Sequence, residues 1–335
     1  MTQDVRLEQL KQWVRSLPGW SDAEFEVASA DASFRRYFRA RKNGQTAIVM
    51  DAPPDKEDTA TFVDVTQRLL AVGVNAPDIL AQHPVAGFLL LQDFGKTPLL
   101  NRLDPASADH YYRDAMQELL KLQVASTRSL PLYDNERLLA EMQLMPEWFL
   151  RTHLHIREAD IPHALIERTF TQLSQEVAHQ PITFVHRDYH SRNLMLQSDG
   201  TLGVIDYQDA LPGPITYDLV SLLRDCYVVW PEQRVRRWAL AFHKEAISAG
   251  NIPPTDEHSF LRWFDLTGLQ RHLKVLGIFS RLNHRDGKSA YLNDLPLVLS
   301  YVLTIGARHP ETAALVEWMR SAGIPARIGT VSIPS

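Results

Sequence analysis

The sequence predicts an α+β protein with a small, strand-rich N-terminal part and a larger, mostly helical C-terminal part. Before residue 95, short runs of β-branched and aromatic residues alternate with turn-forming residues, a pattern typical of strands. After about residue 106, apolar residues recur at helical spacing, with one interruption by strand-like runs. We therefore expect two domains, at residues 1–95 and 96–335.

The N-terminal part is expected to begin with a helix at 3–17, because its leucines and Val14 share one helical face and Pro18-Gly19 ends the pattern. Turn-prone segments then separate three short runs that alternate or are apolar, which indicates consecutive strands. An amphipathic helix and a fully apolar short strand follow. These expected elements lie at 25–29, 36–41, 46–50, 58–71 and 88–91.

The C-terminal part is expected to be helical on either side of a small island of strands. Helical periodicity covers 107–125, 134–151 and 162–178, and it resumes from about residue 217. The island consists of three short apolar runs around a polar loop, at 182–185, 194–196 and 202–205. The prolines of 212–214 predict a loop just before the helices resume.

Composition excludes several classes of protein. The net charge of −5 on 335 residues is too small to indicate a nucleic-acid or membrane surface. Cys226 is the single cysteine, so no internal disulfide is possible and no oxidising compartment is required. There is no signal-peptide pattern and no run of about 18 apolar residues. We expect a cytoplasmic protein.

The chemistry of the chain is concentrated in the island of strands. A strand leads into His186-Arg187-Asp188, Asn193 follows five residues after Asp188, and the next strand ends at Asp206. This is the pattern of phosphoryl-transfer sites. Asn193 and Asp206 supply the hard oxygens that Mg²⁺ prefers, and Asp188 can orient an attacking hydroxyl as the catalytic base. The sequence thus predicts an ATP- and Mg²⁺-dependent kinase.

These residues admit two other interpretations. His186, Asp188 and His190 could bind a catalytic metal in a hydrolase, although no zinc-type spacing occurs elsewhere. The tripeptide His-Arg-Asp also recurs at 284–286, but residue 291 is tyrosine where asparagine is needed, and no strand precedes it. We treat the second copy as a chance match.

The run His186-x-Asp188-x-His190-x-x-Asn193, followed by Asp206, resembles the aminoglycoside phosphotransferase and choline kinase-like superfamily. His190 separates it from protein kinases, which usually carry lysine there. The resemblance implies a bilobal protein-kinase-like fold, with a β-rich, nucleotide-binding N-lobe and a helical C-lobe. It also implies that Asp218 braces the catalytic loop. A protein kinase is disfavoured because no activation segment ending in Ala-Pro-Glu follows.

Within that superfamily, residues 31–39, 49–54 and 270–279 resemble the bacterial anomeric sugar kinases of cell-wall recycling. The resemblance implies phosphorylation of N-acetylmuramate and N-acetylglucosamine at the C1 hydroxyl during peptidoglycan recycling. The product would pass to a sugar-1-phosphate nucleotidyltransferase. Two alternatives stay open: a kinase for another small-molecule hydroxyl, such as an aminoglycoside or choline-like acceptor, and a catalytically silent nucleotide-binding regulator.

The nucleotide site departs from the usual kinase pattern. Met50 occupies the position of the phosphate-binding lysine, no glutamate lies midway along 58–71 to pair with it, and 29–39 contains no glycine. We expect the phosphates to contact Ser33, the neighbouring backbone N–H groups including that of Phe34, and Arg35 or Arg36. The alternative is that these arginines lie on a solvated strand face.

The segment after the strand at 88–91 is the expected hinge. There the carbonyl of Gln92 and the amide of Phe94 can contact an adenine edge.

The acceptor is expected to contact the C-terminal part. Candidates are Arg192 and Asp209, together with His190 and Arg271 from the resemblance. Six Lys or Arg against two acids within 262–288 suggest a basic face, with Lys274 and Arg281 on one side of a helix. Such a face would suit an anionic sugar, and the alternative is an ordinary solvated surface.

Overall fold

The computed structural model describes residues 4–30 and 34–334, which divide into two compact units. Unit 1 is Met1–Pro98 with Leu194–Gln208, and unit 2 is Leu99–Asn193 with Asp209–Ser335. The first division falls close to the boundary expected at 95/96. The structure differs by assigning 194–208 to unit 1, because these residues bond to N-terminal segments: the Val204 amide donates to the Asn75 carbonyl (2.8 Å).

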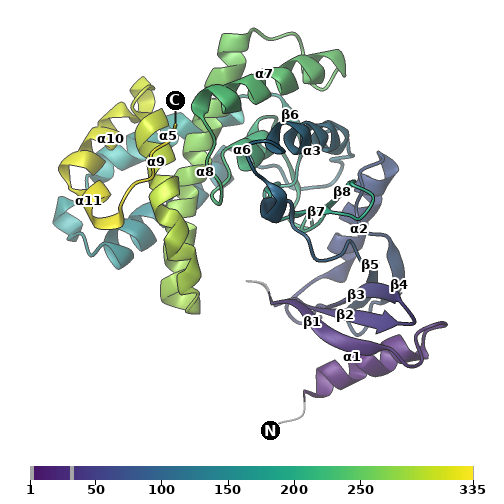
Figure 1. The fold of residues 1–335 in the computed structure, drawn as a ribbon. Helices are drawn as coiled ribbons and strands as arrows, with labels where there is room; N and C mark the ends of the chain where they lie inside the picture. Colours follow the sequence, from purple (N-terminus) through teal and green to yellow (C-terminus); the bar gives the residue numbers. More distant parts are fainter. Residues whose placement is uncertain (1–3, 31–33, 335) are drawn as a thin grey trace. The chain divides into compact units, whose positions relative to one another are not determined.

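Unit 1 is built on an antiparallel five-stranded sheet in the order β1-β2-β3-β5-β4 (Figure 1). Helix α1 covers one face of this sheet, where Leu10 and Val14 form a buried cluster with Phe38, Phe88 and Leu90. The second helix, α2, begins at Thr59 and is capped by Asp58, whose side chain accepts the Ala60 amide. The elements are α1 (Val5–Ser16), β1 (Glu24–Ala30), β2 (Arg36–Lys42), β3 (Gln45–Asp51), α2 (Thr59–Ala71), β4 (Ile79–His83) and β5 (Phe88–Gln92).

A short hairpin completes unit 1. It consists of β7 (Leu194–Leu196) and β8 (Leu202–Val204), paired antiparallel. Gly203 lies against the ring of Phe94, and a Cβ added there would lie 2.3 Å from that ring. Only glycine allows this close approach. The hairpin is thereby packed against the segment that follows β5.

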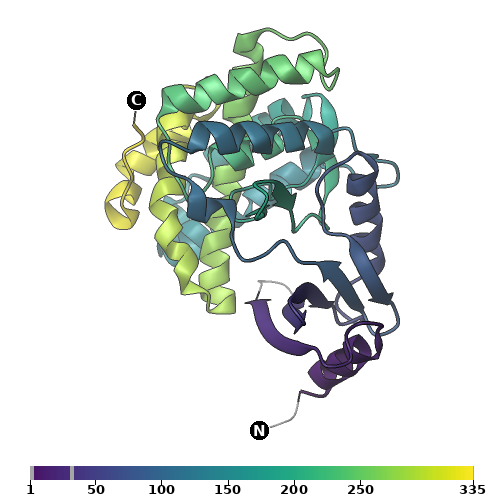
Figure 2. The same ribbon diagram turned by 45° about the vertical axis from the view of Figure 1, so that its right-hand side comes forward.

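Unit 2 is helical and is centred on the 30-residue helix α8, seen in yellow-green in Figure 2. Gly277 lets α8 approach the backbone of Leu144, where an added Cβ would lie 2.4 Å from a carbonyl carbon. The elements are η1 (Leu99–Arg102), α3 (Ala108–Leu122), α4 (Asn135–Met142), η2 (Met145–His153), η3 (Glu158–Asp160), α5 (His163–Ala178), β6 (Ile182–Val185), β9 (Leu211–Pro214), α6 (Tyr217–Leu223), α7 (Glu232–Ser248), α8 (Glu257–Asp286), η4 (Ser289–Asp294), α9 (Leu295–Gly306), α10 (Pro310–Ser321) and α11 (Ile324–Ile328).

Three elements differ from the sequence-based expectation. The single helix expected at 134–151 is α4 followed by η2, a π-helix that begins at Met145 just before Pro146. The expected loop at 212–214 is strand β9, which pairs with β6 although it contains two prolines. Proline is tolerated because β9 lies at the edge of a two-stranded sheet. Strand β4 was not predicted.

Over the ranges 4–30 and 34–334, no helix combines the length and the apolar character that crossing a membrane requires.

Candidate active site

The loop from His186 to Asn193 joins β6 of unit 2 to β7, and its own hydrogen bonds fold it tightly. The His190 amide donates to the Asp188 carbonyl (2.9 Å), and the Asn193 amide donates to the His190 carbonyl (2.9 Å). The Asn193 side-chain Nδ2 also donates to the Asp188 carbonyl (3.0 Å). Arg187 has φ 78°, an uncommon value for a residue with a side chain. Such strain is typical of functional sites held by their surroundings.

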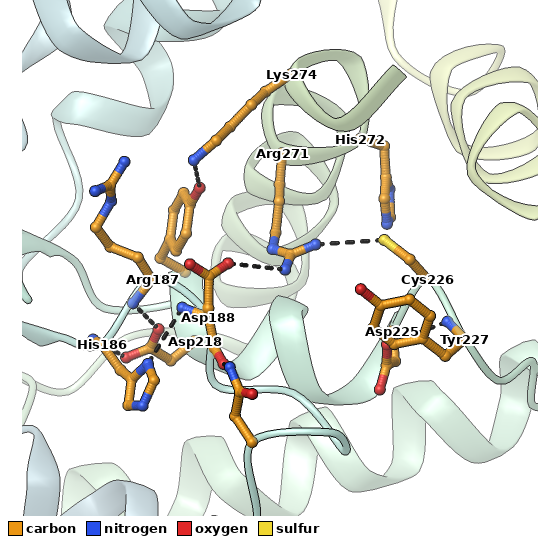
Figure 3. A network of polar contacts seen from close by, with 12 residues as sticks. His186, Arg187, Asp188, Asp218, Asp225, Cys226, Tyr227, Arg271, His272 and Lys274 are labelled. Atoms are coloured by element: carbon orange, nitrogen blue, oxygen red, sulfur yellow. Dashed lines mark hydrogen bonds and ion pairs between the residues drawn. The ribbon is translucent and has the colours of Figure 1, made fainter. Parts of the chain in front are cut away.

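Asp218 of α6 holds the beginning of this loop. Its carboxylate accepts the amides of His186 (2.7 Å) and Arg187 (2.9 Å), as Figure 3 shows. Burial raises the pKa of Asp218 to about 6, although His186 and the two amides act in the opposite direction. The expectation that Asp218 braces the loop is confirmed.

Asp225 holds the middle of the loop in the same way. Its Oδ2 accepts the Ser191 amide (3.0 Å) and the Ser191 hydroxyl, and its Oδ1 accepts the Tyr227 amide (3.2 Å). Asp225 and Ser191 are both fully buried. Asp225 was not predicted from the sequence. The available signal was an acid between Arg224 and Cys226 in a mostly apolar run, because a buried carboxylate requires donors.

A cluster of buried charges lies beneath Arg187. Glu141 of α4 forms ion pairs with Arg187 and with Lys274 of α8 (3.0 Å). Its carboxylate also accepts the Tyr133 hydroxyl, and Lys274 donates to the Tyr217 hydroxyl (3.2 Å). Burial raises the pKa of Glu141, but Lys274 and Arg187 outweigh burial and lower it below its usual value. Glu141 is therefore an anion shared by two cations.

The Asp188 carboxylate is 52% exposed, so it is open to a ligand from solvent. Arg271 of α8 lies behind it, with Nη2 3.8 Å from Oδ1, and donates through Nη1 to the buried Cys226 thiol (3.5 Å; Figure 3). Desolvation would raise the pKa of Asp188, but Lys274, His190 and Arg271 outweigh it and lower the pKa to about 2. Asp188 is thus ionised at neutral pH and can accept a hydrogen bond.

The remaining candidates for acceptor binding lie around the same loop. The His190 ring meets Tyr227 edge-on (centroids 5.3 Å), and burial lowers its pKa, so it is neutral at pH 7. Arg192 is exposed and stacks on Tyr227, with Cζ 3.4 Å from the ring centroid. Asp209 is an exposed residue at the point where the chain re-enters unit 2.

Asp206 lies in unit 1, two residues after β8. It adopts φ 65°, and its Oδ1 accepts a hydrogen bond from Gln208 Nε2 (2.9 Å). The next residue, Tyr207, packs on α2, where its hydroxyl bonds to that of Thr66 (2.9 Å). The middle of α2 therefore presents Thr66, and no glutamate, toward the segment that follows Asp206.

The expected phosphate contacts of unit 1 are partly outside the described residues, since Ser33 belongs to the undescribed 31–33. Phe34 is 64% exposed. Arg35 forms an ion pair with Glu57 (2.7 Å). Arg36 bonds to the buried Asp51 (2.5 and 2.9 Å) and to Asp4.

Both arginines are ion-paired, although the Arg36 side chain is 38% exposed and that of Arg35 only 11%. Because Arg36 holds a buried carboxylate of β3, the contacts favour a structural role for it.

Met50 is fully buried in β3 and is paired with Tyr37 and Leu89 on the neighbouring strands. The expected hinge follows β5 and is fixed by an ion pair that the sequence analysis missed. Asp93 binds Arg39 of β2 (2.6 and 2.9 Å) and also accepts the Gly95 amide (2.9 Å).

The segment is held on both sides of Asp93. The Gln92 amide bonds to the Asp78 carbonyl (2.9 Å), and the Phe94 side chain is buried. The backbone proposed to contact adenine is thus rigidly held.

Comparison with known proteins gives this arrangement a family. Residues 24–259 match the phosphotransferase enzyme family known as APH, which is well over half of the chain. The chain belongs to this phosphotransferase family. The match includes the loop at 186–193, Asp206 and Asp218.

The phosphotransferase has relatives that are similar over nearly their whole length. A protein of Pseudomonas aeruginosa named N-acetylmuramate/N-acetylglucosamine kinase is 45% identical over 332 residues, which cover 96% of this chain and 98% of that protein. A protein of Neisseria meningitidis serogroup B with the same name is 41% identical, covering 91% and 92% respectively.

Solved structures show the fold. A choline/ethanolamine kinase family protein from Mesorhizobium loti superposes with a TM-score of 0.64 at 11% identity, covering 94% of this chain and 99% of that one. ADP-bound aminoglycoside phosphotransferase APH(2'')-Ib superposes with a TM-score of 0.56 at 14% identity, covering 89% and 98%. The expected protein-kinase-like fold is confirmed for this phosphotransferase.

The basic segment of the phosphotransferase, 262–288, does not form one solvated face. Arg271 and Lys274 are buried and lie against Asp188 and Glu141. Arg262 pairs with Glu311 (2.5 Å). The sequence could not reveal this, because these partners come from other helices and from the catalytic loop. The second His-Arg-Asp, at the exposed end of α8, includes an Arg285–Asp286 ion pair (2.8 Å).

The metal-hydrolase alternative predicted a cluster of metal-binding side chains. Within 4–30 and 34–334, no group of three or more His, Cys, Asp or Glu side chains converges in a way that could hold a metal. The amide of Asp188 donates to His186 Nδ1 (3.2 Å), which directs this nitrogen toward the loop backbone.

Proposed function

We propose that the chain is an ATP-dependent kinase that phosphorylates the C1 hydroxyl of N-acetylmuramate and N-acetylglucosamine. The observation that carries this proposal is full-length similarity, at 41–45% identity, to relatives that bear this name. The supporting geometry is the catalytic loop. It carries an exposed, ionised Asp188, and its backbone is hydrogen-bonded on either side of this residue to the buried carboxylates of Asp218 and Asp225. A place in peptidoglycan recycling, with transfer of the product to a nucleotidyltransferase, extends the same proposal.

In the proposed reaction, the C1 hydroxyl oxygen attacks the γ-phosphorus and the bond to the bridging oxygen of ADP breaks. Asp188 accepts a hydrogen bond from the hydroxyl and receives its proton as the new bond forms. A carboxylate with a pKa of about 2 is a weak base. Its main contribution is orientation of the nucleophile, which suits a transition state with little covalent demand.

The donor set fits a magnesium ion, because Asn193 and Asp206 both carry hard oxygens. The bond from Asn193 Nδ2 to the Asp188 carbonyl fixes the amide so that Oδ1 is the end opposite the loop. When bound, Mg²⁺ would neutralise phosphate charge during transfer. We propose Asn193 and Asp206 as its ligands.

Nucleotide contacts are proposed for unit 1 and acceptor contacts for unit 2. The hinge carbonyl of Gln92 and the amide of Phe94 would bind adenine, and Ser33, Phe34 and Arg35 would contact the phosphates. His190, Arg192, Asp209 and Arg271 are proposed for the acceptor side; in its present position Arg271 acts through Asp188.

The test measures ADP release with N-acetylmuramate, N-acetylglucosamine, choline and an aminoglycoside, with phosphorus NMR to locate the new phosphate. We expect an anomeric phosphate on the two N-acetyl sugars. Activity on choline or the aminoglycoside alone would overturn the acceptor assignment, and nucleotide binding without any product would favour the silent regulator. Asp188→Asn should retain nucleotide binding while kcat falls by roughly 10²–10⁴-fold; undiminished turnover would refute its role.

A further inference from the structure

Arg192 differs from Arg187, Arg271 and Lys274 in its partners. Arg187 and Lys274 are paired with Glu141, and Arg271 lies beside Asp188. Among the described residues, no carboxylate oxygen lies within 4.0 Å of the Arg192 guanidinium. Arg192 also acts on the half-buried Asp294, whose pKa is raised by burial and lowered by Arg192. Arg192 therefore has charge available for a ligand.

The guanidinium of Arg192 lies directly over the ring of Tyr227. Its Cζ lies 3.4 Å from the centroid of the Tyr227 ring, the separation of stacked planar groups. The ring covers one side of the guanidinium, and the N–H groups that do not face the ring remain for hydrogen bonds to a ligand. A planar edge with parallel N–H groups matches a carboxylate, which can accept two of them at once.

One buried carboxylate fixes the backbone on both sides of this stack. Asp225 accepts the amide and hydroxyl of Ser191, the residue before Arg192. It also accepts the amide of Tyr227 (3.2 Å). Because both partners of the stack are tied to the same buried group, the arginine edge is pre-organised, which lowers the entropy lost when a ligand binds.

The other cations near Asp188 are poor candidates for recognising an anionic acceptor. The side chains of Arg271 and Lys274 are only 5% and 9% exposed, and each already lies against an acid. A ligand carboxylate would have to displace these internal partners at a desolvation cost. Arg192 is exposed and four residues from the catalytic base on the same loop.

We propose that Arg192, stacked on Tyr227, binds the carboxylate of an acidic N-acetyl sugar and so sets the preference for acidic over neutral acceptors. This inference rests on the proposed function, because it takes N-acetylmuramate and N-acetylglucosamine as the acidic and neutral members of one substrate pair. The anionic group of the acceptor would thus be bound by Arg192 on the catalytic loop, and not by the basic helix face expected around Lys274 and Arg281.

The test crosses enzyme variants with matched substrates. Wild type and Arg192→Gln are assayed with N-acetylmuramate, with N-acetylmuramate whose carboxylate is converted to the amide, and with N-acetylglucosamine. Arg192→Gln should lower kcat/KM for N-acetylmuramate about 10- to 100-fold, as expected for loss of a charge-assisted bidentate pair. The loss on N-acetylglucosamine, which lacks the carboxylate, should be much smaller, so the ratio of the two kcat/KM values should fall.

The wild type should use the amide as poorly as Arg192→Gln uses N-acetylmuramate itself. On the amide, kcat/KM should be the same for Arg192→Gln as for the wild type. That non-additivity is the signature of direct contact between the two groups. Arg192→Lys keeps the charge but not the planar edge and should fall between wild type and Arg192→Gln. Tyr227→Phe keeps the stacking face and should retain selectivity, whereas Tyr227→Leu should lose it.

The matched control is Arg237→Gln, which removes one exposed arginine of α7 that pairs with Asp109 (3.2 Å) and should leave all three substrates unchanged. Equal losses on both sugars would overturn the proposal and indicate contact with a group common to both reactions, such as the transferred phosphate. Unchanged selectivity would overturn it too.

Calorimetric measurement of the binding of each sugar in the Asp188→Asn background separates the proposed kinase function from the proposed role of Arg192. If the wild type phosphorylates neither sugar but Arg192→Gln still weakens N-acetylmuramate binding, the proposed function alone fails. If Arg192→Gln leaves that binding unchanged, the inference fails whatever the outcome of the activity assay.

Discussion

Replacing Glu141 by glutamine should strongly destabilise unit 2. Its carboxylate is shared by Arg187 and Lys274, and the exposed fractions of the three side chains are only 18%, 23% and 9%. A glutamine side chain at this position would keep the volume and one acceptor oxygen but not the charge. Two largely buried cations would then lack a counter-ion, a situation that is costly in a low-dielectric environment.

The expected magnitude follows from measured losses of one partner in buried ion pairs, which are about 3–5 kcal/mol. Lys274 keeps its bond to the Tyr217 hydroxyl and Arg187 lies over the Tyr133 ring, so the lower end of that range is expected. About 3 kcal/mol is a large fraction of the stability of an ordinary domain. Because Arg187 precedes Asp188, kcat should also fall.

Urea unfolding followed by tryptophan fluorescence measures this effect, because five of the seven tryptophans, including Trp148 of η2, belong to unit 2. The matched variants are Lys274→Met and the double substitution. Removing Lys274 along with the carboxylate should recover about 1–2 kcal/mol of the loss, because one unpaired cation is gone. A decrease below about 1 kcal/mol for Glu141→Gln, or strict additivity in the double variant, would refute the shared-anion interpretation.

Three further outcomes are expected. The Cys226 thiol, whose pKa is raised by burial to about 11, should react with a disulfide reagent only when urea unfolds the protein; fast reaction in buffer would contradict its burial. Gly203→Ala places a Cβ 2.3 Å from the Phe94 ring, so it should destabilise unit 1 by about 1–3 kcal/mol and raise KM for ATP more than for sugar. The pKa of Asp218 is raised from 3.8 to about 6, so its contribution to stability is present below pH 4 and is lost as the pH rises through 6. Urea midpoints of wild type and Asp218→Asn, compared between pH 4 and 7, should therefore diverge over that window, and parallel profiles would argue against a raised pKa.

Much of the fold could be predicted because local patterns dominate it. The strands at 182–185 and 194–196 were predicted with the bounds that the structure shows, since short apolar runs flanked by polar residues have few other solutions. The π-helix at Met145–His153 could not be predicted, because it has the same apolar periodicity as the helix before it. Strand β9 could not either, since its prolines are tolerated only at the edge of a small sheet.

The candidate site divides along a similar line. Asp188, Asn193 and Asp206 could be predicted because the loop and the hairpin that carry them are local in sequence, so the spacing of these residues is visible without the fold. The partners that hold the loop come from elsewhere: Asp218 follows β9, and Glu141 is 46 residues before Arg187. Of these two, the sequence revealed only Asp218, through family resemblance.

By itself, the sequence determined the identity and order of the chemical groups: Asp188, Arg192 and Asn193 on one short loop, and Asp206 after the hairpin that follows it. Only the tertiary structure decided which charges remain available to a ligand. Arg271, Arg192 and Lys274 look alike as basic residues in the sequence, yet folding buries two of them against acids and leaves Arg192 exposed on Tyr227. The physical reason is that pairing depends on partners from distant segments, and the cost of leaving a buried charge unpaired fixes those pairs during folding.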